Sequence, residues 1–380
     1  MQPYGELKMK SLSKTSLFIT LISLTLSVAH AQDSATFNAE EGAWKLYFQD
    51  SDTQRWIHRT YIQQNAIKPS ISTSIAWSGD RFSYRYRVAN ARGAKQAIDT
   101  FRIWGIPSIY SVPALPPIGA DIKTETGLWT KQQFAQLEAK RQFQNEIIKA
   151  PKGWSANLRV DEKVNQTSFV WTPGLKDTDP SGINPGAQQG GYIVLRPELP
   201  GVARAKLTGS TDAPWGLDDL PDTPFWSQKI DEIQDRDFLL VAVLAPVIEV
   251  PVPYNSAELA RRIKAHVQTW PKYGHTDAAT LDRLNRQFDV LIPALVGNNK
   301  PAAQEAVFDL FKEAFSHNGG LNHRKLDDDD EDRAAAPLAR LFINPTVVEA
   351  RAAMPSVQMD RIAARSLAFN LVYLLARLEK

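Results

Sequence analysis

The residues with the clearest capacity for chemistry lie in and around a loop bounded by two tryptophans, Trp215 and Trp226. The loop carries three carboxylates, Asp218, Asp219 and Asp222, and two prolines. A sugar ring needs a flat aromatic surface to stack on and acceptors for its hydroxyls, and this loop supplies both. The sequence therefore predicts a ligand site here. The alternative is that both indoles are core residues, which the usual burial of large aromatic side chains favours.

A second candidate is a run of four consecutive carboxylates, Asp327, Asp328, Asp329 and Asp330. Clustered carboxylates attract a hard cation such as calcium, because the cation neutralises their mutual repulsion. The glycine that an EF-hand loop requires at its sixth position is absent, and a solvated acidic loop between two helices explains the run without a metal. We expect no cofactor, and calcium at this run is the alternative.

No residue of the chain can be assigned a catalytic role from its surroundings in the sequence. The chain has no cysteine, which excludes thiol nucleophiles, zinc–thiolate sites and redox pairs. No G-x-S-x-G motif marks a serine nucleophile, and no two carboxylates are paired as glycoside cleavage requires. His58, His266 and His275 are available in principle for a Ser-His-Asp arrangement. The sequence leaves catalysis open and favours a protein that is not an enzyme.

The first 31 residues have the pattern of a secretory signal peptide. Lysines precede an apolar run over Leu17–Val28, and Ala29 and Ala31 stand at the two positions that a signal peptidase reads. The run is shorter than the roughly 20 residues of a membrane-spanning helix. We therefore expect cleavage after Ala31, export to the periplasm or the extracellular space, and no transmembrane segment in the mature protein. Met1 and Met9 are both consistent with the start of such a signal.

The charge of the chain bears on its partners. It has 44 Lys and Arg residues against 42 Asp and Glu residues, and the signal segment contains the whole excess of basic residues. A mature protein without net charge has no long-range attraction for phosphate backbones. We therefore expect a ligand or protein partner outside the cytoplasm and no nucleic acid.

The first half of the chain has the two-residue period of β-strands. Residues 71–77 and 82–88 each alternate large and small or polar side chains, and Ser78-Gly79-Asp80 between them is typical of a hairpin turn. The wholly apolar segment Phe238–Ala245 indicates a strand that is buried on both faces. A capping-box pattern at Thr130 indicates one helix, which would run to about Ile148.

These patterns predict an α+β protein with two parts. We expect an immunoglobulin-like β-sandwich with one inserted helix over residues 32–253, and an antiparallel helical bundle over residues 254–380. The prolines at Pro251–Pro253 mark the change from one pattern to the other. Ser256 and Thr276 are the expected caps of the first two helices.

Segments in both halves resemble parts of exported bacterial proteins. The turn Gly297–Lys300, the helix Ala302–Phe315 and the helix Ala363–Leu378 are similar to small C-terminal helical modules of secreted bacterial proteins, FIMAH-like domains among them. The β half resembles uncharacterised exported proteins through Trp171, the turn Pro185-Gly186, and Gly191-Tyr192. The resemblance implies an exported protein with a sandwich and a helical module, and it transfers no catalytic residue.

The sequence thus favours an exported, non-enzymatic binding or structural protein of unknown ligand. The alternative is a carbohydrate-directed protein, either a lectin-like module or a glycan hydrolase. The two differ in one respect, because a sugar site needs exposed aromatic rings beside convergent polar groups, whereas a structural protein buries those rings.

Overall fold

The computed structural model describes residues 32–78, 81–107, 146–161, 166–174, 182–210, 217–316 and 359–378. Within these ranges the chain is a mixed α+β protein, with twelve strands in three antiparallel sheets and five α-helices. The expected signal peptide lies outside the described residues, as does most of the helix expected over 130–148.

The strands are β1 (Ser34–Asn38), β2 (Ala43–Gln49), β3 (Trp56–Ile62), β4 (Pro69–Ser78), β5 (Arg81–Asn90), β6 (Ile98–Pro107), β7 (Ile148–Lys149), β8 (Trp154–Asp161), β9 (Gln166–Pro173), β10 (Gln188–Arg196), β11 (Leu199–Gly209) and β12 (Leu239–Ile248). The helices are η1 (Leu217–Asp219), α3 (Pro224–Gln234), α4 (Ser256–Val267), η2 (Trp270–Tyr273), α5 (Ala278–Val296), α6 (Lys300–Ser316) and α8 (Arg361–Leu378), of which η1 and η2 are 3-10 helices.

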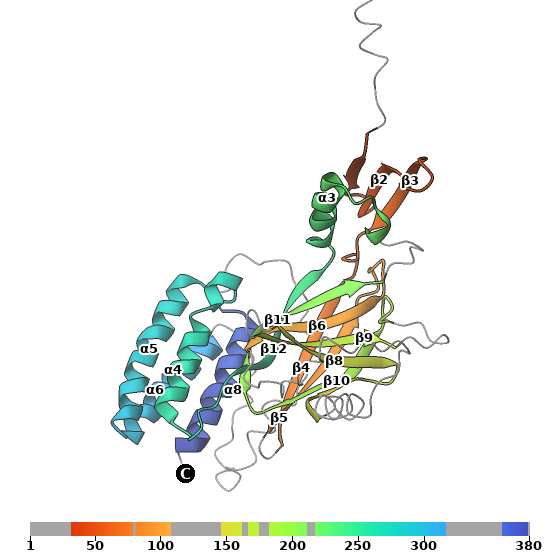
Figure 1. The fold of residues 1–380 in the computed structure, drawn as a ribbon. Helices are drawn as coiled ribbons and strands as arrows, with labels where there is room; N and C mark the ends of the chain where they lie inside the picture. Colours follow the sequence, from red (N-terminus) through yellow and green to blue (C-terminus); the bar gives the residue numbers. More distant parts are fainter. Residues whose placement is uncertain are drawn as a thin grey trace, which may run out of the picture. The chain divides into compact units, whose positions relative to one another are not determined.

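The chain divides into two compact units (Figure 1). The small unit consists of residues up to Gln63 together with Asp212–Asp235, and the large unit consists of Gln64–Thr211 and Arg236–Lys380. The sheets that contain β4–β12 and the helices α4–α8 belong to the same large unit. The composition change at Pro251, from which we expected two parts, lies inside that unit.

The small unit is a three-stranded sheet in the order β1-β2-β3. In β2, Trp44, Leu46 and Phe48 are buried, as alternation along a strand places them on one face. This face packs against Leu217 and against Trp226 of α3. The unit therefore has its own hydrophobic core, closed by a segment that follows the sheet by about 150 residues in sequence.

Helix α3 was not predicted, because we expected a loop where it begins. Thr223 has an extended backbone and its side chain accepts a hydrogen bond from the Trp226 N–H, and Pro224 occupies the first turn. Both features are typical of a helix start. The sequence therefore contains the start of this helix, but its two prolines are equally typical of a loop.

The large unit contains a four-stranded sheet in the order β4-β5-β10-β7 and a five-stranded sheet in the order β12-β11-β6-β9-β8. The pairing of β4 with β5 confirms the hairpin predicted from alternation, with Ile75 opposite Tyr84. Aromatic rings from the two sheets contact each other. Tyr86 lies 5.8 Å from Phe101, and Phe101 lies 5.4 Å from Tyr192, in edge-to-face arrangements.

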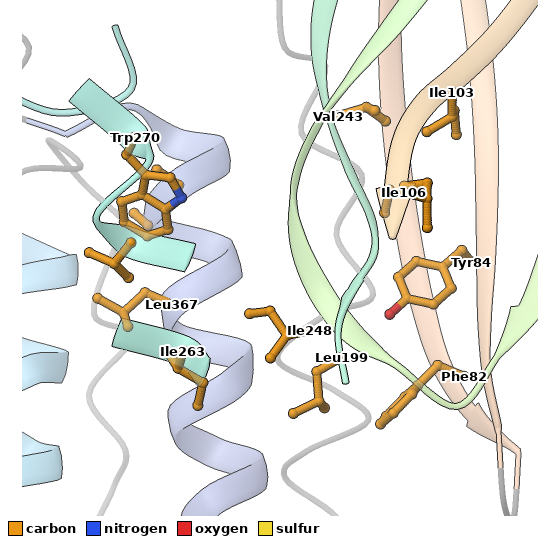
Figure 2. Close-up of a cluster of buried hydrophobic side chains, with 14 of the residues drawn as sticks. Phe82, Tyr84, Ile103, Ile106, Leu199, Val243, Ile248, Ile263, Trp270 and Leu367 are labelled. Carbon is orange, nitrogen blue, oxygen red and sulfur yellow. The ribbon is translucent and has the colours of Figure 1, made fainter. Parts of the chain in front are cut away.

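Helices α4, α5, α6 and α8 lie side by side in the large unit (Figure 1). The caps of two helices are one residue from those expected: Asn255 caps α4 and Asp277 caps α5, each accepting from a backbone N–H of the first turn. Helix α5 continues through Pro293 to Val296. Side chains of the helices and of both sheets form one buried cluster (Figure 2).

Polar side chains from two helices complete the backbone hydrogen bonding of β11. Ser366 and Asn370 of α8 both donate to the Pro200 carbonyl at 2.9 Å, and the Val202 N–H donates to Nε2 of His266 at 2.8 Å. Gly201 lies between these residues, and a Cβ on it would lie 2.7 Å from the His266 ring. A glycine is therefore required where α4 approaches the strand.

Candidate functional site

The outer face of the small unit's sheet, opposite its core, carries a regular set of aromatic and polar side chains. Because directly opposed residues of antiparallel strands point to the same face, the register assigns its members. Tyr47 stands between Ser34 and His58, Lys45 stands between Thr36 and Thr60, and Gln49 is opposite Trp56. We call these eight residues the aromatic face.

Three rings at the centre of the aromatic face contact one another. The Tyr47 ring lies 4.8 Å from the Trp56 ring, with an angle of 24° between their planes, and 4.3 Å from the His58 ring. His58 is exposed, and Tyr47 and Trp56 are partly exposed. The three rings therefore form a row that retains accessible surface on a sheet whose other face packs into the core of the small unit.

The polar members surround this row. The side chains of Ser34, Thr36 and Thr60 are exposed hydroxyls, and Gln49 adds an amide. Lys45 forms a 2.5 Å ion pair with Glu41, and both side chains are about half exposed. The eight residues of the face include no carboxylate, so it presents aromatic surface, neutral donors and acceptors, and one ammonium group.

The sequence did not identify this face, although its signal was there. Residues 43–49 and 56–62 contain five aromatic side chains, and both segments have the two-residue alternation of a strand in part. What brings Tyr47, Trp56 and His58 together is the cross-strand register, which a single strand's pattern does not contain.

Of the residues predicted as a carbohydrate site, Trp226 has no surface that a sugar could contact. Trp226 is fully buried in the core of the small unit, where its ring contacts Phe48 and Phe225 and its indole N–H donates to Asp33 at 2.9 Å. A ring without accessible surface has no face for a sugar, so the indole serves packing. Trp215 and the Asp218 side chain lie outside the described residues.

The two remaining carboxylates of that predicted site are on the surface. Asp219 is the last residue of η1 and Asp222 precedes the cap of α3, and both are exposed. The acidic run Asp327–Asp330 and the cleavage positions Ala29 and Ala31 lie outside the described residues. In the part of the chain that is described, no three His, Asp or Glu side chains lie together as metal ligands would.

The three histidines that the sequence offers for catalysis have different surroundings and different partners. His58 belongs to the aromatic face, whereas His266 and His275 belong to the large unit. Nδ1 of His275 lies 2.5 Å from one carboxylate oxygen of Asp360, whose other oxygen accepts from the Ala363 N–H and caps α8. The carboxylate of this pair thus has a structural task at the helix start.

His266 is partly buried, and its Nε2 accepts a hydrogen bond, which requires a neutral ring. Burial first, and the nearby His275 second, together lower the pKa of His266 to about 4. His266 is therefore neutral at physiological pH. Its Nε2 already accepts the Val202 N–H, so this nitrogen is not free to take a proton as a general base.

No protein-family model, curated protein or solved structure matches this chain. Among the described helices, none is both long and apolar enough to cross a membrane. The assignment of function therefore rests on the side chains of the chain itself.

Proposed function

We propose that the protein is an exported, non-enzymatic binding protein and that its ligand is a carbohydrate bound on the aromatic face. The observation that carries the proposal is the row of Tyr47, Trp56 and His58, three contacting rings with accessible surface on one face of a small sheet. Sugar rings bind through their apolar C–H faces, which stack on aromatic rings, and through hydroxyls, which need neutral donors and acceptors.

The composition of the aromatic face favours a sugar over other ligands. A hydrophobic protein partner would require a wider apolar patch, whereas here hydroxyls and an amide stand next to the rings. A strongly anionic ligand would require several cations, and the only lysine of the face is paired with Glu41. Neutral polar groups beside flat rings are typical of a site for a neutral or weakly charged glycan.

In this proposal the large unit is a scaffold. We propose that its two sheets are an immunoglobulin-like sandwich and that α4–α8 are a helical module docked on it. Export through a cleaved signal peptide would bring the aromatic face to the periplasm or the extracellular space, where polysaccharides are abundant. No catalytic residue is part of the proposal, because the aromatic face contains no pair of carboxylates.

A glycan array and affinity electrophoresis in soluble polysaccharides test the proposal. We expect the mature protein to bind at least one glycan, and Trp56→Ala to abolish that binding while the protein stays folded. Phe308→Ala is the matched control, because Phe308 is a 57 % exposed aromatic residue of the large unit. Equal binding by wild type and Trp56→Ala, or no binding to any glycan, would contradict the proposal.

A further inference from the structure

A second site is present in the large unit, along the seam between α8 and β4. On α8, Arg365, Phe369 and Tyr373 follow one another at every fourth position and therefore lie on neighbouring turns of one side of the helix, with Arg361 one turn before them. On β4, alternation places Thr73, Ile75 and Trp77 on one face.

The contacts between this side of α8 and the β4–β5 hairpin follow the order of the residues along β4. Near the start of α8, Arg365 and Thr73 line the same small pocket. One turn further, Phe369 lies 5.6 Å from Phe82, the residue opposite Trp77 in the hairpin. At the next turn, Tyr373 lies 5.8 Å from Trp77 itself. The seam therefore begins at a guanidinium and continues as a row of aromatic rings.

The pocket at the start of the seam is lined by Thr73, Ile75, Leu244, Arg365 and Phe369. Its volume is about 10 Å³, the room needed by one water-sized group such as a single carboxylate or phosphate oxygen. Two of the lining residues, Thr73 and Arg365, have polar side chains, and the other three are apolar.

Arg365 has no anionic partner among the described residues, although it is partly buried. Its nearest charged neighbour on the helix is Arg361, four residues earlier, which also has no ion pair in the described part of the chain. Burial first, and the like charge of Arg361 second, lower the pKa of Arg365 from its ordinary value. Two unpaired guanidiniums one turn apart repel each other, and an anion placed between them would remove that cost.

We propose that this seam binds an organic anion, a carboxylate or phosphate group carried on an apolar body. One oxygen of the anionic group enters the pocket, where the guanidinium of Arg365 and the hydroxyl of Thr73 donate to it. The apolar body lies along the rings of Phe369, Tyr373 and Trp77, the last of which is 49 % exposed. The site is independent of the aromatic face, since its residues all belong to the large unit.

Calorimetric titration of the full mature protein with four probes tests this site. Phenyl phosphate and phenylacetate combine both features of the ligand, inorganic phosphate has only the charge, and benzyl alcohol has only the apolar body. We expect the first two to bind, inorganic phosphate to bind about tenfold more weakly, and benzyl alcohol not to bind. Equal affinity for phenyl phosphate and inorganic phosphate would overturn the proposal, as would binding of benzyl alcohol as tight as that of phenyl phosphate.

Variants distinguish the proposed pocket from unspecific binding. Arg365→Gln should weaken phenyl phosphate binding at least about tenfold, because it removes the charge and the paired donors. Arg286→Gln, which neutralises an exposed arginine of α5, is the matched control and should leave the affinity unchanged. Thr73→Val has nearly the same shape as the wild type and should also weaken binding. It serves as the test if Arg365→Gln does not fold. Unchanged affinity in Arg365→Gln, or in a folded Thr73→Val, would overturn the assignment.

Discussion

Acid should destabilise the large unit through His266, by an amount that the structure allows us to work out. In the folded protein the pKa of His266 is lowered to about 4, against an ordinary value of 6.5 in the unfolded chain. Between these two values the unfolded state binds a proton and the folded state does not, so stability falls as the pH falls. The contribution is fully present above pH 6.5 and is lost progressively down to pH 4.

Each pKa unit of difference corresponds to about 1.4 kcal/mol in the free energy of unfolding. From pH 6.5 to pH 5 the loss is therefore about 2 kcal/mol, and it reaches about 3 kcal/mol near pH 4. A protonated ring would also have no lone pair left on Nε2 to accept the Val202 N–H, so the strand loses its hydrogen bond at the same step. The assay is urea unfolding at pH 7, 6, 5 and 4, followed by circular dichroism.

His266→Gln isolates this effect from the carboxylates that titrate in the same range. Glutamine can present its amide oxygen near the position of Nε2 and accept the same N–H, and it does not titrate. We expect its stability at pH 7 to be within about 1 kcal/mol of wild type, and the difference between wild type and variant to change by about 2 kcal/mol between pH 7 and pH 5. Parallel stability curves for the two proteins over this range would refute the reasoning.

Two further predictions concern packing and charge in the large unit. Gly201→Ala should destabilise it by about 1 to 3 kcal/mol, because the new Cβ would lie 2.7 Å from the His266 ring. Thermal melting checks this. The control is Gly190→Ala, whose new Cβ would meet only a side chain at 3.8 Å and which should melt near wild type. Glu198→Ala should lower the free energy of unfolding by about 3 to 5 kcal/mol. It leaves the buried guanidinium of Arg196 without the two hydrogen bonds, at 2.8 and 2.9 Å, that the carboxylate accepts. Chemical unfolding should show that the double variant Arg196→Met/Glu198→Leu loses far less stability than this single variant.

The parts of the fold that the sequence predicts well are those whose pattern is complete within one segment. The β4–β5 hairpin is an example, because strict alternation over 71–77 and 82–88 specifies both strands and their pairing. The helices after Pro253 are another, although their caps at Asn255 and Asp277 lie one residue from the expected positions. At each start the competing residues Ser256 and Thr276 are also good caps, so residue type alone does not choose between neighbours.

The small unit was missed because its core is assembled from distant segments. Trp44 and Trp226 belong to the same buried cluster, yet more than 180 residues separate them. Neither the three short strands nor the eleven-residue α3 buries enough surface alone to give a strong local signal. The two-residue period near Trp44 indicates a strand, but nothing in it indicates which helix covers the strand.

The candidate site was missed for a related reason. Trp226 was considered for a sugar site because it adjoins carboxylates in sequence, whereas its burial depends on the sheet that covers it. Nothing in the sequence joins Tyr47 and Trp56 to His58, which the sequence suggests only as a catalytic candidate, because the contact of the three rings arises from the pairing of β2 with β3. Proximity along the chain suggested the first set, and proximity across the sheet defines the second.

The measurement that tests the central proposal most directly is the affinity of the mature protein for its best glycan from the array, by titration calorimetry, with Trp56→Ala, Trp56→Phe and Phe308→Ala in parallel. Loss of one stacking ring should weaken binding at least about tenfold in Trp56→Ala, and Trp56→Phe should restore part of it because a ring is retained. Phe308→Ala should bind as wild type does. A folded Trp56→Ala protein with wild-type affinity would contradict the account.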